Sequence, residues 1–140
     1  MIINYYEILR DFGKLKTREE RKQFLIETND NFKVFLKYAF DPEIQFYVYK
    51  FPSEYVKPDT LPGIRYAGID SELRRIYLFI KGNETADALL PQRRREIYIQ
   101  ILESFEPEEA DLLVKMFKKD LKVNFLTYNL VKETFPNLIP

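Results

Sequence analysis

The lysines near the C-terminus are the residues best suited to chemistry, and the chemistry that they favour is the binding of phosphate groups. Five lysines and a single acid, Asp120, lie between Lys115 and Lys132. The chain of 140 residues carries 22 basic and 22 acidic residues, so this stretch is a local positive patch on a neutral protein. Lysines that neutralise DNA phosphates release counterions and so favour binding. The alternative is a solvated helix end, because lysine is mostly exposed and suits the last turn of a helix.

Residues for catalysis are scarce. The chain has no cysteine and no histidine, which removes disulfides, cysteine–zinc sites and the commonest general base and metal ligand. Its four glycines form no glycine-rich phosphate loop. The cluster of Glu108, Glu109 and Asp111 is a conceivable metal site, but carboxylates in the first turn of a surface helix usually stay solvated. We therefore expect no catalytic residues, no metal and no cofactor.

The elements around the lysines are two helices and a turn. Apolar residues at helical spacing predict a helix that continues to Leu121. Asn124 is a suitable left-handed residue after that helix, because asparagine tolerates a positive φ better than most residues. Thr127 can cap a short helix that carries Leu130, Val131 and Phe135 and stops at Pro136.

The same stretch resembles the end of the N-terminal DNA-binding domain of ATP-dependent DNA ligases, of the phage type. The residues that carry the resemblance are Lys119, Asp120 and Leu121, followed by Lys132, Phe135, Pro136, Leu138, Ile139 and Pro140. The likeness covers nearly the whole chain more loosely, through an aromatic segment at 40–52 and a turn at 81–83. The chain departs from the family in the turn, where Val123 and Asn124 replace Cys-Gly, and at Asn137, which replaces another glycine; the segment 124–135 is also one residue longer.

The resemblance implies a non-catalytic domain that grips double-stranded DNA across the minor groove without reading its sequence, with nicked duplex as the expected form. The positions where the family's domain meets DNA correspond here to Lys118, Lys119, Lys122, Asn124, Thr127 and Lys132. The adenylation motif K-x-D-G is absent, since Asp120 directly follows Lys119 and no glycine comes after it. We therefore expect one domain, 1–140, without the adenylation and OB domains, as a ligase fragment or a small stand-alone phage protein.

A second function stays open because the turn departs from the family. The fold could persist as a protein-interaction module that has lost DNA binding and meets a phage or host protein. Arg93, Arg94 and Arg95 stand in the first turn of a predicted helix at 92–105, where they repel one another and oppose the helix dipole. Local stability does not explain these arginines, so we expect them to form a secondary contact with DNA or with a protein.

The pattern over the whole chain predicts an all-α fold, a compact array of about seven or eight helices joined by short loops. The expected helices cover 2–12, 17–27, 30–39, 70–82, 85–90, 92–105, 107–121 and 127–135. Thr17 and Glu20 form a capping box, and Asn29 or Asp30 caps the third helix. Asp41-Pro42 resembles a cap followed by a first helical proline. For the segment IQFYVYKF after it we expect a short buried helix or an extended segment, and for 53–62 a loop.

The aromatic cluster of Phe46, Tyr47, Tyr49 and Phe51 admits two interpretations. The rings could stack on bases, or they could fill a helical core that is short of leucine. We expect the core, since large aromatic side chains are mostly buried. No apolar run approaches the ~20 residues of a membrane helix, so we expect no membrane contact and a cytoplasmic location, which is the host cytoplasm if the protein is phage-encoded.

Overall fold

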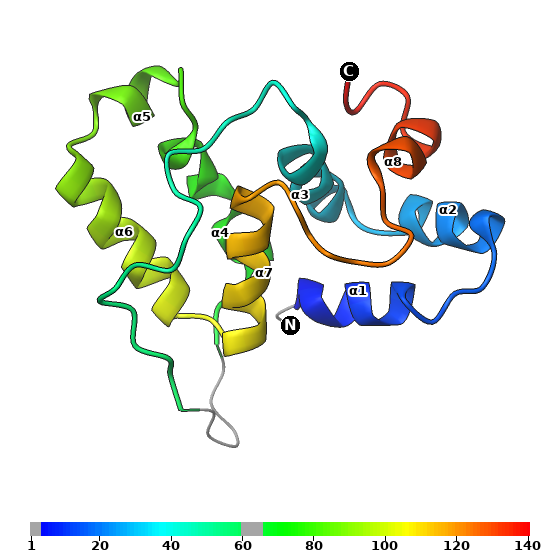
Figure 1. Ribbon diagram of the computed structural model, residues 1–140, viewed down its shortest axis with the longest axis horizontal. Coiled ribbons are helices and arrows are strands. Elements are labelled where there is room, and N and C mark those ends of the chain that lie inside the picture. The colour runs from blue at the N-terminus through cyan, green and yellow to red at the C-terminus, as the bar shows by residue number, and fades with distance from the viewer. Residues whose placement is uncertain (1–3, 60–65) are drawn as a thin grey trace.

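A computed structural model describes residues 4–59 and 66–140 of the chain, and these residues form an all-helical fold (Figure 1). The prediction of an all-α protein is confirmed. The described residues contain eight α-helices and one 3₁₀ helix, and no β-strand. The α-helices are α1 (Tyr5–Phe12), α2 (Arg18–Ile26), α3 (Asp30–Phe40), α4 (Ile69–Glu72), α5 (Glu84–Ala88), α6 (Pro91–Glu103), α7 (Pro107–Phe117) and α8 (Tyr128–Thr134), and the 3₁₀ helix is η1 (Leu73–Phe79).

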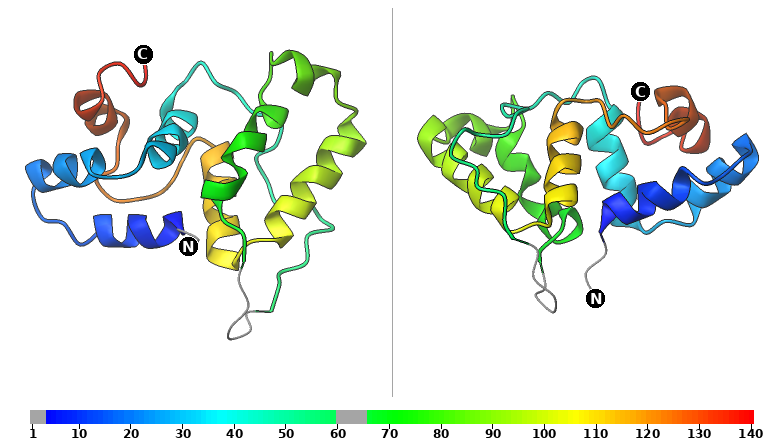
Figure 2. Two further views of the ribbon diagram at one scale, coloured as in Figure 1. Left: turned by 180° about the vertical axis from the view of Figure 1, so that it is seen from behind. Right: turned by 60° about the horizontal axis from the view of Figure 1, so that its bottom comes forward.

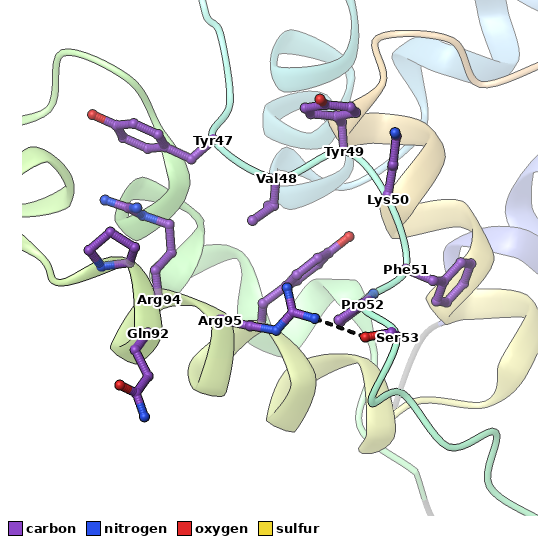
Figure 3. A pocket seen from close by; sticks show the side chains of 12 residues that line it. Tyr47, Val48, Tyr49, Lys50, Phe51, Pro52, Ser53, Gln92, Arg94 and Arg95 are labelled. Atoms are coloured by element: carbon purple, nitrogen blue, oxygen red, sulfur yellow. Dashed lines mark hydrogen bonds between the residues drawn. The ribbon is translucent and has the colours of Figure 1, made fainter.

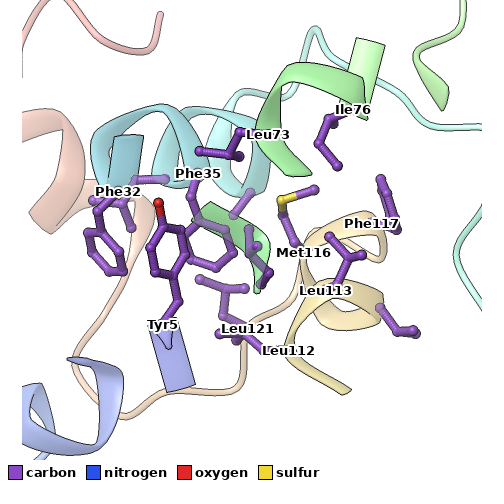
Figure 4. Packing of buried hydrophobic residues seen from close by; sticks show 14 of the residues in the cluster. Tyr5, Phe32, Phe35, Leu73, Ile76, Leu112, Leu113, Met116, Phe117 and Leu121 are labelled. Atoms are coloured by element: carbon purple, nitrogen blue, oxygen red, sulfur yellow. The ribbon is translucent and has the colours of Figure 1, made fainter. Parts of the chain in front are cut away.

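Helix α7 lies at the centre of the molecule. It packs against α1 and α3 on one side and against α6 on the other, as the three views show (Figures 1 and 2). Seven of its residues are buried, including Leu112, Leu113 and Met116. Around it, Tyr5 meets Phe32 and Phe35 edge to face, with ring centroids 5.0 and 5.2 Å away (Figure 4). Each such fully buried side chain stabilises the fold by roughly 1.5–3 kcal/mol.

Side-chain caps begin several helices as the sequence predicts. Thr17 Oγ1 accepts a hydrogen bond from the Glu20 amide at 3.2 Å, and Asn29 Oδ1 accepts one from the Phe32 amide at 2.8 Å. The reciprocal half of the expected capping box differs, because the Glu20 carboxylate accepts from the Thr17 hydroxyl rather than from its amide. Helix α1 ends at Phe12, as the expected range 2–12 predicts, and positions 2 and 3 of that range lie outside the described residues. The apolar residues of α3 recur at helical spacing and are all buried: Phe32, Phe35, Leu36 and Ala39.

The interpretation of Asp41-Pro42 as a helix start is wrong. Asp41 ends α3 instead, and its Oδ1 accepts from the Glu43 amide at 2.9 Å. The following segment is extended and is held by one antiparallel bridge between Phe46 and Ile80. Its β-branched and aromatic residues agree with this extended conformation. The helix predicted at 70–82 is also divided: Gly68 is the N-cap of α4, which passes directly into η1 before the turn at Gly82.

A buried carboxylate joins three helices at the base of the fold. Glu109 in α7 is 0% exposed and accepts hydrogen bonds from the amides of Tyr5 and Tyr6 at 3.0 Å and of Ile69 at 3.2 Å. These amides belong to the first turns of α1 and α4, which have no partner within their own helices. Burial raises the pKa of Glu109, and the three amides oppose that rise. Glu109 is therefore a structural clamp that fixes α1 and α4 to α7.

Two of the three acidic residues of the conceivable metal site have partners within the protein. Asp111 pairs with Lys115 at 2.8 Å, while Glu109 is turned inward. In residues 4–59 and 66–140, no three acidic side chains gather in a way that could hold a metal ion. No helix in the same ranges is long and apolar enough to cross a membrane.

Candidate nucleic-acid interface

Helix α7 ends earlier than the sequence predicts, and a lysine takes the left-handed position that we assigned to Asn124. The Lys119 amide donates to the Met116 carbonyl at 3.0 Å, and the Asp120 amide donates to the Lys115 carbonyl at 3.1 Å. These two bonds are the Schellman arrangement, in which the residue after the cap adopts a positive φ. Lys119 is that residue, with φ 63°. The prediction for Asn124 was wrong because the apolar Leu121 belongs to the loop and not to the helix.

The loop that follows is unusually strained. Lys119, Lys122 and Phe125 have φ values of 63°, 55° and 70°, and they are all the non-glycine residues with positive φ among those that the structure describes. A side chain in this conformation costs roughly 1–3 kcal/mol and persists where the surrounding structure or function requires it. Two of these three residues are lysines that the sequence places at the DNA contact. The strained loop, residues 118–127, is thus a candidate for a functional segment.

Two of the predicted contact lysines point inward. Lys119 Nζ donates to the Tyr38 carbonyl and lies 5.3 Å from the centroid of the Phe46 ring. Burial lowers the pKa of Lys119 to about 8. Lys132 Nζ donates to the carbonyls of Pro136 at 2.7 Å and Ile139 at 2.9 Å, and so holds the C-terminal segment against α8. Both lysines have structural partners before any ligand arrives.

The other predicted residues of the strained loop are exposed. Lys118, Lys122 and Asn124 face solvent. No ion pair or side-chain hydrogen bond engages the ammonium groups of Lys118 and Lys122 within the described part of the chain. Thr127 begins α8 as predicted, because its Oγ1 accepts from the Leu130 amide at 3.2 Å. Of the predicted set, Lys118 and Lys122 are the cations with free charge.

The three arginines of α6 are all engaged by the protein. Arg93 pairs with Glu96 at 3.2 Å, and Arg95 forms an ion pair with Glu54. Arg94 is buried, and its Nη2 donates to the carbonyl oxygens of Ala86 at 2.6 Å and Leu89 at 3.3 Å. Its guanidinium also lies 3.8 Å from the centroid of the Tyr47 ring. These contacts explain the arginines that helix stability alone did not.

Arg94 and Arg95 line a pocket of about 550 Å³ between the start of α6 and the extended segment (Figure 3). In Figure 3, Tyr47 covers Arg94 on one side, and Tyr49, Lys50 and Phe51 follow along the extended segment. The lining residues are Tyr47, Val48, Tyr49, Lys50, Phe51, Pro52, Ser53, Pro91, Gln92, Arg94, Arg95 and Tyr98. No acidic residue is among them. We refer to this site as the α6 pocket.

The α6 pocket continues into the strained loop through two smaller hollows. Tyr49 also lines a hollow of about 280 Å³ with Lys81, Lys118 and Lys119. Lys119 in turn lines a hollow of about 300 Å³ with Lys122 and Asn124. The three sites share lining residues and form one surface, which we call the basic track. Its cations are Lys50, Lys81, Arg94, Arg95, Lys118, Lys119 and Lys122.

Comparison with known proteins identifies a family but no function. Residues 8–123 match the model of a family of unknown function, DUF6433. The chain belongs to this family. No curated protein matches it. The match includes every cation of the basic track, whereas Asn124, Thr127 and Lys132 lie beyond its end.

Sequence reasoning missed part of the basic track of this DUF6433 protein. It did not select Lys50 and Lys81, and it assigned the aromatic cluster to the core. Phe46 is buried there as expected, but Tyr49 and Phe51 are 51% and 38% exposed. One signal could have identified Lys81, because it directly precedes the turn at Gly82, where φ is 89°. Another could have identified Tyr49 and Phe51, because their segment ends at Pro52, and proline suits an exposed extended segment.

Proposed function

We propose that this protein is a non-catalytic, sequence-independent binder of double-stranded DNA. The observation that carries the proposal is the basic track, which gathers seven cations and one lining acid, Asp120, on a protein of zero net charge. DNA binding without sequence preference depends on phosphate contacts rather than on base edges. The basic track offers such contacts along a continuous surface.

The free lysines of the basic track are the proposed phosphate contacts. Lys50, Lys81, Lys118 and Lys122 are exposed and come from three separate parts of the chain: the extended segment, the turn at Gly82 and the strained loop. Exposed ammonium groups that lie apart suit consecutive phosphates of a duplex backbone, each of which carries one negative charge. Lys119 would add positive potential from its position between two hollows, although its ammonium is held by Tyr38.

The resemblance to the DNA-binding domain of phage-type DNA ligases supports the same proposal and suggests nicked duplex as the preferred form. In that resemblance the strained loop corresponds to the family's contact turn. Backbone amides near Asn124, next to the Thr127 cap of α8, would donate hydrogen bonds to phosphate oxygens. Since Lys132 is bound to two carbonyls, we assign it to the scaffold of the site rather than to the DNA contact. We place this function in the cytoplasm, of the host if the protein is phage-encoded.

The test is a titration of the purified protein onto a fluorescent duplex, nicked and intact, at low and moderate salt. The proposal requires binding to both duplexes that weakens steeply with salt, and Lys118→Glu/Lys122→Glu should reduce the affinity by about tenfold or more. The matched control is Lys14→Glu/Lys16→Glu, which reverses two exposed lysines outside the basic track. A folded protein that binds neither duplex at low salt would contradict the proposal.

The second candidate function is a protein-interaction module, and exposed apolar side chains favour it. Leu90 at the start of α6 is 72% exposed, and Val56, whose amide donates to Glu103 at the end of α6, is 69% exposed. Tyr49 and Phe51 of the extended segment are exposed as well. All three arginines of α6 are also already paired or buried. A protein contact on this face would resist salt because it would depend on apolar burial. Binding to a phage or host protein that persists at high salt, without DNA binding, would favour this function.

A further inference from the structure

The α6 pocket has the size and shape of a site for one small planar group. Its volume of about 550 Å³ lies within the range of roughly 300–1,000 Å³ that is typical of ligand sites. The extended segment forms one wall and α6 forms the other (Figure 3). From Val48 to Phe51, no backbone amide of the extended segment donates to another described residue. The wall therefore keeps its hydrogen-bonding groups available.

Two buried polar atoms on residues that line the α6 pocket have no partner. Arg94 is 8% exposed, and its Nε makes no hydrogen bond, although its Nη2 is bound to two carbonyls. Tyr98 is 3% exposed, and its hydroxyl makes none either. Buried polar groups in folded proteins are nearly always paired, so each exception needs an explanation, such as an ordered water or a ligand. Both atoms are almost inaccessible from the pocket, so a ligand that paired with them would require a small movement of the side chains.

The aromatic residues of the pocket limit the ligand to a flat one. Tyr47 already stacks on the Arg94 guanidinium, and Tyr49 is 51% exposed. The Phe51 ring points away from α6 and packs against Tyr55 (Figure 3). Stacked aromatic and guanidinium planes are how proteins hold unpaired nucleobases. Every base has a flat face that stacks on such planes. Its edge carries hydrogen-bonding atoms, which are the kind of partner that Arg94 Nε and the Tyr98 hydroxyl lack.

The uncompensated charge of the pocket suits an anion attached to that flat group. Lys50 is exposed and Arg94 is bound to carbonyls only, whereas Arg95 is neutralised by Glu54. Tyr49 joins the pocket to the hollow of Lys81 and Lys118, where the phosphates of the proposed duplex would lie. A base in the α6 pocket could thus remain connected to a backbone on the basic track.

We propose that the α6 pocket holds the base of an unpaired nucleotide, at an end or interruption of the DNA that lies on the basic track. This assignment rests on the proposed DNA-binding function and adds to it a preference for one form of DNA over another. The protein would distinguish DNA with an unpaired nucleotide from a blunt duplex, with a gain of about tenfold in affinity, the order that stacking of one base supplies.

The experiment compares a blunt duplex with the same duplex carrying one unpaired nucleotide, a fluorescent adenine analogue, at its end. Wild-type protein should bind the overhanging duplex about tenfold more tightly and quench the analogue by stacking. Tyr98→Phe removes only a hydroxyl that has no partner, so it should keep or raise the melting temperature and the affinity for blunt duplex while reducing the overhang preference. Tyr49→Leu should reduce both the preference and the quenching.

The matched control is Tyr77→Phe, the same change at an exposed tyrosine of η1 outside the pocket, and it should leave the preference intact. Equal affinity of the wild-type protein for the two duplexes, without quenching, would overturn the pocket assignment while the proposed function stands. If neither duplex binds, the proposed function fails, and deoxyadenosine monophosphate added to the labelled protein decides the pocket by NMR. Shifts at Arg94 and Tyr98 would support the nucleotide site, and their absence would refute it.

Discussion

The strained loop and the first turn of α6 are similar in sequence and different in structure. Each brings three cations together within a few residues, and both were predicted as contact sites for a partner. In α6 every arginine is already bound by the protein itself, through Glu96, Glu54 or the carbonyls beneath Arg94. In the strained loop, Lys118 and Lys122 remain free and only Lys119 is tied back to the fold. The comparison teaches that clustered charge does not equal available charge.

The difference has a physical cause in the backbone. A regular helix places arginines where carboxylates of neighbouring segments and exposed carbonyls can reach them. The strained loop instead leaves Lys118 and Lys122 in solvent, and two of its three lysines, Lys119 and Lys122, are left-handed at a conformational cost of roughly 1–3 kcal/mol each. A protein under selection for stability alone would have glycine in the Schellman position that Lys119 holds. Lys119 instead uses this position to donate to the Tyr38 carbonyl.

We expect the largest loss of stability from a change at the buried carboxylate Glu109. The substitution Glu109→Leu leaves the amides of Tyr5, Tyr6 and Ile69 without their acceptor. We expect the free energy of unfolding to fall by about 3–5 kcal/mol, measured by urea denaturation. The control is Glu108→Leu, next to it on the exposed side of α7, which should change stability by about 0.5 kcal/mol or less. Similar losses for the two variants would show that the clamp contributes little.

We expect a smaller loss of stability from a change at Arg94, and a still smaller one at its neighbour Arg93. Arg94→Met removes the hydrogen bonds to Ala86 and Leu89 and the stacking on Tyr47, so we expect a loss of about 2–3 kcal/mol of stability. Arg93→Met breaks only an exposed pair and should cost about 0–1 kcal/mol. Thermal unfolding of both variants checks this order. If Arg93→Met were the more harmful, our division of the arginines would be incorrect.

The smallest effect concerns pH and Lys119. Burial lowers the pKa of Lys119 from 10.5 to about 8, so between these values the unfolded chain binds more protons than the folded one, and stability should rise with pH. In the folded protein, the positive charge that Lys119 gives the basic track is lost around pH 8. We expect DNA affinity to fall by less than about tenfold between pH 7 and 9, while Lys119→Arg, which stays charged, should show a smaller fall. A parallel fall in the two proteins would exclude Lys119 as the cause.

Local rules predicted much of the fold. The caps at Asn29 and Thr127, the proline at the start of α7 and the buried face of α3 each depend on residues within one or two turns. The failures depend on distant partners or on competing local geometry. Asp41 accepts an amide in a tight turn instead of starting a helix, and Lys119 finds a carbonyl at Tyr38, 81 residues away. Which lysines stay free is decided by such distant contacts, so the sequence could identify the cluster but not the available charges.

The slope of the logarithm of DNA affinity against the logarithm of salt concentration tests the central claim most directly, because it counts the cations that meet phosphates. We predict that Lys118→Gln/Lys122→Gln lowers this slope by about 1.8, since each contact contributes about 0.9. Arg93→Gln/Arg95→Gln should leave it unchanged, because those two arginines are already paired. Equal slopes for the wild-type protein and the lysine variant, or an equal reduction in both variants, would contradict the account.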